Sequence, residues 1–64
     1  GLVGAETFAA VDPRNNRKLA KDLVKLAGRA EPHRYVFFAS PMFPGTTRLP
    51  KLERGGVQVW SVDV

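Results

Sequence analysis

The chain contains no cysteine and only one histidine among its 64 residues. Without thiols it can form no disulfide and no thiolate metal site, and a lone imidazole is too little for a structural zinc site. The absence of cysteine fits a reducing compartment, and we expect a cytoplasmic protein. No apolar run approaches the roughly 20 residues of a membrane-spanning helix, and no secretion signal is visible.

Three motifs of nucleotide-binding proteins and hydrolases are also absent, namely GxxxxGK[ST], GxGxxG and GxSxG. The segment that follows the first apolar stretch, DPRNNRK, contains no glycine and so offers no backbone cradle for a phosphate. A small molecule held near Ser40 and Asp12, at strand ends, is therefore the weakest of the functional hypotheses. Ser40 precedes a proline, and a turn explains it better.

Positive charge is in excess, with ten Lys and Arg against six Asp and Glu and a net charge of +4. Such a balance favours polyanionic partners. Sixty-four residues make one small domain with a modest core. The chain starts inside an apolar stretch and without methionine, so we expect a fragment or an excised domain.

The segment Asp12–Arg29, DPRNNRKLAKDLVKLAGR, has the strongest helical periodicity. Asp12 or Asn15 can cap its start, Pro13 suits a first turn and Gly28 a stop. One side of the helix collects apolar residues, namely Leu19, Leu23 and Leu26, with Ala20 and Ala27 beside them. The opposite side is predicted to be basic.

That basic side comprises five residues, with Arg17 next to them: Arg14, Lys18, Lys21, Lys25 and Arg29. The only acid on the helix itself is Asp22, which can pair with Lys18 or Lys25. A solvated outer face is one interpretation of this stripe. The other is a surface that contacts the phosphates of DNA or RNA, in which these six residues bind nucleic acid.

Three segments read as strands, namely Leu2–Val11, Arg34–Ala39 and Val57–Val64. A proline-rich loop, Ser40–Pro50, and one helical turn at Pro50–Arg54 separate the last two. The predicted fold is α/β: a single small β-α-β-β domain at 1–64, with three mainly parallel strands and one long amphipathic helix on one face.

Both faces of these strands are apolar, which is the pattern of a sheet covered on both sides. One helix covers one face. We therefore expect the other face to meet a second copy, giving a homodimer or larger homo-oligomer, or sequence of the parent protein. Trp60 is expected in the core, and Phe43 and Met42 as anchors of the loop or as an exposed apolar patch.

Glu6 lies in the first predicted strand among apolar neighbours, where a carboxylate needs a partner. A surface pair with Arg34 or a helix lysine is one explanation, and a catalytic or metal-binding role is the other. A strand with Glu, a helix with Lys and a buried strand that ends in Ser-Pro resemble the second half of a restriction-endonuclease-like nuclease core. The family's Glu-x-Lys would place its lysine at Phe8, so the motif is incomplete.

The resemblance implies hydrolysis of phosphodiesters assisted by Mg²⁺, with Glu6 as metal ligand and catalytic residue. Lys18 or Lys21 would replace the missing lysine, as in relatives that carry it on the following helix. The first acid of the family would lie before Gly1. We therefore expect a nucleic-acid-associated module that is inactive by itself, and whether it is an enzyme stays open. The alternative is a non-catalytic interaction or self-assembly domain that uses the uncovered sheet face.

Overall fold

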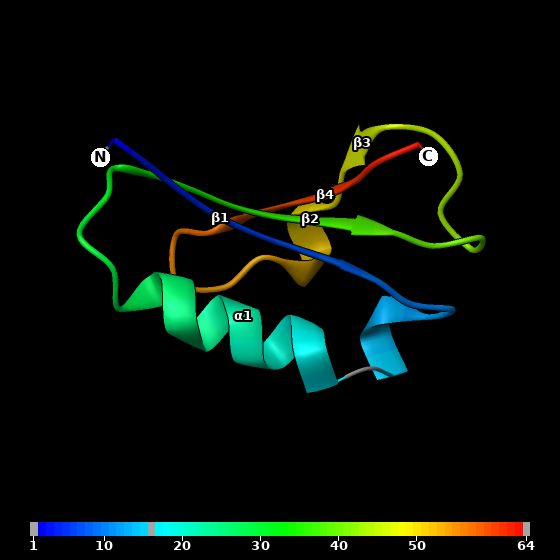
Figure 1. Cartoon of the computed structure of the whole chain (residues 1–64), viewed down its shortest axis with the longest axis horizontal. Coiled ribbons are helices and arrows are strands. Elements are labelled where there is room, and N and C mark those ends of the chain that lie inside the picture. The colour runs from blue at the N-terminus through cyan, green and yellow to red at the C-terminus, as the bar shows by residue number, and fades with distance from the viewer. Residues whose placement is uncertain (1, 16, 64) are drawn as a thin grey trace.

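The computed structural model describes residues 2–15 and 17–63. Along the chain these residues form β1 (Val3–Ala9), the 3-10 turn η1 (Pro13–Asn15), α1 (Arg17–Ala27), β2 (His33–Ala39), β3 (Thr47–Arg48), η2 (Pro50–Leu52) and β4 (Gln58–Ser61). The strands make one sheet in the order β1-β2-β4-β3, and α1 lies along one face of it (Figure 1). The predicted small α/β domain with a mostly parallel sheet is confirmed.

The sheet has four strands in the described residues, not three, and it is mixed. β1, β2 and β4 are parallel, whereas β3 runs antiparallel to β4. β3 comes from the proline-rich segment that was expected to be a loop. The outer edge of β4 recruits this segment, because the N–H of Leu49 donates to the carbonyl of Val59 at 2.8 Å and the Ser61 hydroxyl donates to two carbonyls, those of Gly45 and Thr47.

The predicted helix is divided into η1 and α1, and Asn16 between them lies outside the described residues. Asp12 does act as a cap, but of η1, since its carboxylate accepts the N–H of Arg14 at 3.0 Å. The side chain of Asn15, the alternative cap, is also outside the described part. α1 ends at Ala27, immediately before the predicted stop at Gly28.

The core lies between α1 and the sheet, as the periodicity predicted. Leu19, Leu23 and Leu26 are buried against four side chains of the sheet side, namely Val36, Phe38, Val57 and Val59. Burial of each such side chain stabilises the fold by about 1.5–3 kcal/mol. The two alanines expected beside the leucines, Ala20 and Ala27, are exposed.

The carboxyl end of α1 is fixed by β2 and by a glycine turn. The Arg34 guanidinium donates to the carbonyls of Leu26 and Ala27 at 3.3 and 3.1 Å, and the Leu26 carbonyl also accepts the N–H of Arg29 at 3.0 Å. Gly55 and Gly56 both adopt positive φ, +64° and +76°. A Cβ on Gly55 would lie 2.7 Å from that of Ala27, so glycine lets the turn contact the helix.

None of the helices in the described residues is long and apolar enough to span a membrane.

Candidate functional site

Glu6 faces α1, because alternate residues of β1 point to the helix side of the sheet. Its carboxylate forms an ion pair with the ammonium group of Lys25, and its side chain is 22% exposed. This contact holds the pKa of Glu6 below its ordinary value, with smaller contributions from the charges of Lys18 and Arg29. A pair with a helix lysine was one of the two interpretations of Glu6, and the structure shows that contact.

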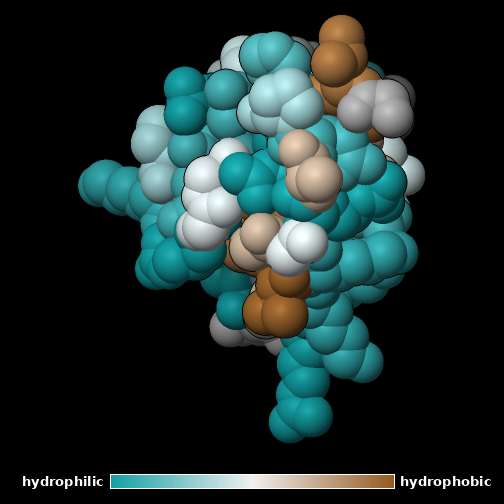
Figure 2. Space-filling model, turned by 90° about the vertical axis from the view of Figure 1, so that its left-hand side faces the viewer, coloured by the Kyte–Doolittle hydropathy of each residue, from teal (hydrophilic) through white to brown (hydrophobic). Residues whose placement is uncertain are grey.

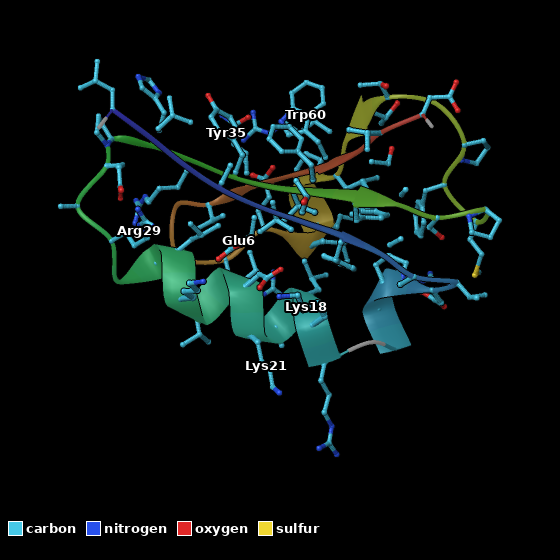
Figure 3. All side chains as sticks on the ribbon, in the orientation of Figure 1. Glu6, Lys18, Lys21, Arg29, Tyr35 and Trp60 are labelled. Atoms are coloured by element: carbon cyan, nitrogen blue, oxygen red, sulfur yellow. The ribbon has the colours of Figure 1, made fainter. Side chains whose placement is uncertain are left out.

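A second ion pair joins Lys18 to Asp22 at 2.9 Å, one helical turn apart. Asp22 is 2% exposed, and its Oδ2 atom has no hydrogen-bond partner among the described residues. Asp22 raises the pKa of Lys18 through this bond. Glu6 and Lys18 both lie between the sheet and α1 (Figure 3). The side of α1 next to β1 therefore carries compensated charge and not an open basic surface.

The two lysines proposed to complete the nuclease motif lie differently relative to Glu6, and the charge of Lys18 is one of those that lower the Glu6 pKa. Lys18 is hydrogen-bonded to Asp22, and Lys21 points away from the sheet (Figure 3). Lys25, which the sequence placed only in the basic stripe, contacts Glu6 instead. Lys18 and Lys25 are seven residues apart and therefore share one helix face. This spacing could have indicated either lysine as the partner of Glu6.

The charge on the remaining basic residues is also largely compensated. Arg14 pairs with Asp12 at 3.0 Å, and Arg29 pairs with Glu31. Four of the six candidate nucleic-acid-binding residues thus contact carboxylates, leaving Arg17 and Lys21 with no carboxylate partner in the described part. Six cations against four paired acids give this region a charge of +2 (6 − 4).

The opposite face of the sheet is uncovered, and its middle is aromatic. Tyr35 and Phe37 of β2 stack at 5.6 Å, and Trp60 is the β4 residue in register with Phe37. Figure 3 shows Tyr35 and Trp60 on the side of the sheet away from α1. The prediction of Trp60 in the core is therefore wrong: Val59 and Ser61 of β4 face the helix, and Trp60 is only half-buried.

We call this surface the open face and define it by alternate residues of the three parallel strands and by Val62, which follows β4: Val3, Ala5, Thr7, Ala9, His33, Tyr35, Phe37, Ala39, Gln58, Trp60 and Val62. None of these side chains is acidic. The β1 half carries small residues and the β2–β4 half carries the rings. The Trp60 indole donates to the Gln58 side-chain carbonyl at 3.0 Å, which satisfies its N–H beside the apolar surface.

Other parts of the surface differ from the open face. Figure 2 shows the end of the molecule where β1 begins, and there hydrophilic residues predominate and apolar residues form separate patches. At the opposite end, the carboxyl ends of the strands surround a hollow of about 620 Å³. Ser40 lines it, but its hydroxyl donates to the carbonyl of Val11 and accepts the N–H of Met42. These bonds favour the structural role of Ser40.

The two predicted anchors of the loop, Phe43 and Met42, differ in their exposure. Phe43 contacts the core ring of Phe38 edge-on at 5.5 Å, whereas Met42 is 50% exposed. Within the described residues no three His, Asp or Glu side chains gather to hold a metal ion.

Comparisons with protein-family models, curated proteins and solved structures gave no match.

Proposed function

We propose that this chain is a non-catalytic assembly domain whose open face packs against the open face of a second copy. The observation that carries the proposal is the acid-free, aromatic surface on the side of the sheet opposite α1. Sheets of parallel strands are normally covered on both faces, because their crossover helices and neighbours bury both sets of side chains. Here α1 covers one set only.

The two halves of the open face complement each other in size. Ala5 and Ala9 on β1 leave a shallow strip, whereas Phe37 and Trp60 on β2 and β4 stand above the sheet. A twofold axis that lies in the interface, parallel to the strands, lays the rings of one copy over the alanines of the other, and this happens twice. The interface is thereby self-complementary without any charged pair.

The size of the open face sets the expected strength of the dimer. Seven residues at about 3.3 Å each and three strands about 4.8 Å apart give a footprint of roughly 23 by 14 Å. This is smaller than the roughly 800 Å² per partner of a standard stable interface. We therefore expect a dimer that dissociates on dilution.

Sedimentation velocity over a range of concentrations tests the proposal. The unaltered chain should shift from monomer to dimer as concentration rises, and Phe37→Asp should remain monomeric because it places a charge at the centre of the face. Met42→Asp is the matched control, since Met42 is apolar and exposed but lies outside the open face. Loss of the dimer in both variants, or in neither, would contradict the proposal.

Trp60 supplies an independent readout because it is the only tryptophan of the chain. Its fluorescence should become less accessible to iodide over the concentration range in which the dimer forms. A chain that stays monomeric throughout, with Trp60 always accessible, would exclude self-association through this face.

Nucleic-acid association is the second candidate function, and the exposed cations Arg17 and Lys21 support it. The nuclease chemistry implied by the resemblance has less support. Glu6 is engaged by Lys25, and the described residues offer no group of three ligands, so they do not fit a Mg²⁺ site on their own. We derive no hydrolytic step from them.

Fluorescence titration of labelled duplex and single-stranded oligonucleotides at low and moderate salt tests the second candidate. Binding should weaken steeply with salt and should fall in the double variant Arg17→Glu, Lys21→Glu. The double variant Lys51→Glu, Arg54→Glu is the matched control, because it makes the same change in net charge at exposed positions outside α1. Equal affinity of all three proteins would reject a role for these two cations.

A further inference from the structure

A groove on the helix side of the molecule is lined by three basic side chains, and only one of them, Arg14, is paired with a carboxylate, that of Asp12. Two adjoining hollows, which share Arg14, Lys51 and Leu52, run between α1 and η2. Their apolar walls come from both of these elements and from the loops beside them, namely Pro13, Leu19, Ala20, Leu23, Phe43, Leu49, Pro50 and Leu52. The charged side chains that line the groove are all basic: Arg14, Lys51 and Arg54.

Two of these cations are available to a ligand. Lys51 has no ion pair within the described residues, and Arg54 bonds only to main-chain carbonyls. Those bonds, to the carbonyls of Lys51 and Glu53 at 3.3 and 2.7 Å, both use its Nη1 atom. The guanidinium is therefore held in place while its other N–H donors stay unused, which suits it for bidentate recognition of a carboxylate.

The groove does not suit a nucleobase or a phosphate chain as well as it suits a peptide. The rings of Phe43 and Phe38 pack in a T-shaped arrangement, and the Arg14 guanidinium lies over the Phe43 ring at 5.5 Å from its centroid, so a nucleobase would have to displace Arg14 to stack on that face. η1 and η2 begin with Pro13 and Pro50, which have no N–H to donate to an anion.

We propose that this groove binds an acidic peptide segment with interspersed apolar residues, supplied by another protein. Leucine-like side chains of the peptide pack on Leu52 and its neighbours, and its carboxylates pair with Lys51 and Arg54. The surface is separate from the open face, which holds no cation of this group. An assembled dimer would then present two such grooves.

Fluorescence polarisation with three labelled peptides of equal length tests the proposal. One alternates Leu and Glu, one alternates Leu and Lys, and one alternates Gly and Glu. The Leu-Glu peptide should bind the full chain, and the other two should bind at least tenfold more weakly because each lacks one half of the complementarity. Equal binding of the Gly-Glu and Leu-Glu peptides would overturn the apolar part of the proposal.

Variants locate the binding on the protein. The double variant Lys51→Glu, Arg54→Glu should weaken binding of the Leu-Glu peptide at least tenfold, whereas Arg17→Glu, Lys21→Glu, an equal charge reversal outside the groove, should change it less than twofold. Circular dichroism melts establish that each variant is folded. Equal sensitivity to both sets of substitutions would mean attraction to net charge, and would overturn the groove as the site.

A labelled single-stranded oligonucleotide is the last arm of the experiment. The groove proposal predicts that its affinity does not depend on Lys51 and Arg54 more than on Lys21. If the oligonucleotide loses binding in the groove variant and the Leu-Glu peptide fails to bind at all, the occupant is nucleic acid and the peptide proposal is wrong. Dimerisation through the open face is measured separately and does not depend on either result.

Discussion

The two faces of the sheet use the same strands for different purposes. Toward α1, Val36 and Phe38 of β2 are completely buried, and Glu6 at the margin is paired with Lys25. Away from α1, Tyr35 and Phe37 of the same strand are only half-buried. The side chains of one face are buried within the chain, and those of the other face remain partly exposed. The comparison teaches that alternation along one strand places fully buried and partly exposed rings at neighbouring positions.

The largest expected effect on stability comes from replacing one phenylalanine with alanine on either face of the sheet and comparing the two variants. Phe38→Ala should lower the free energy of unfolding by about 3–5 kcal/mol, because it leaves a cavity in the core. Phe37→Ala should cost about 1 kcal/mol in the monomer, since less of its surface is buried. Urea denaturation at a concentration below dimerisation measures both. Equal losses would contradict the distinction between the faces.

The next effect concerns the glycine turn that supports the covered side. Gly55→Ala should cost about 1–3 kcal/mol, because it adds backbone strain at positive φ and a clash with Ala27. Gly45→Ala is the control, since Gly45 has φ +86° but no atom within 4 Å of the added Cβ. Thermal melts should place Gly45→Ala between Gly55→Ala and the unaltered chain. The reverse order would show that strain outweighs the contact.

Acid should lower the stability of the folded monomer more than it weakens the contact between two copies. The pKa of Glu6, Asp12, Glu31 and Glu53 is lowered in the fold, in each case first by a hydrogen bond from a basic side chain. A lowered pKa adds stability above the unfolded-state pKa, and this stability is lost as pH falls through about 4 and below. The urea concentration at the midpoint of unfolding should therefore be lower at pH 3 than at pH 6.

Lys25→Met sharpens the acid test because it removes the main cause of the lowered Glu6 pKa. Its stability should depend less steeply on pH over that range. The open face has no carboxylate, so loss of these ion pairs acts on the stability of the monomer and not on the contact between the two copies. An unchanged pH profile in Lys25→Met would show that its ion pair with Glu6 contributes nothing.

The smallest effect is expected for Thr7→Val on the open face. The substitution removes a hydroxyl from the small-residue strip and should leave the free energy of unfolding of the monomer within about 0.5 kcal/mol. It should tighten the dimer severalfold, because twofold symmetry places the substitution in the interface twice. Val24→Thr is the control on the outer surface of α1, where Val24 is 76% exposed, and it should leave dimerisation unchanged.

The elements with strong periodicity could be predicted from the sequence. The features that depend on contacts with other parts of the chain, such as β3 and the orientation of Trp60, could not. Leu19, Leu23 and Leu26 define the buried side of α1 by spacing alone. β3 has no side-chain pattern, because backbone and hydroxyl hydrogen bonds to β4 create it. Both alternating sets of residues in the strand of Trp60 include apolar ones, so the sequence pattern did not reveal which set faces the helix.

The candidate site divides in the same way. Spacing indicated the Lys18–Asp22 pair because both residues lie on one helix, whereas the partner of Glu6 depends on how α1 crosses β1. The groove cations Lys51 and Arg54 were missed altogether. Their only signal was a basic turn between prolines and glycines, and its position against η1 and α1 arises from the tertiary fold.

The register of β1 and β2 has a consequence for how the chain reaches its native state. Val3 pairs with His33, and each later pair keeps the same separation of 30 positions (33 − 3). This pairing is gained only when a loop of that length closes, and the parallel pairing of β2 with β4 requires a loop of 23 positions (58 − 35). α1, with 11 residues, is too short to be stable in isolation. Helix and strands must therefore form together, so folding should be a single cooperative step, slower than that of a helical bundle of equal length.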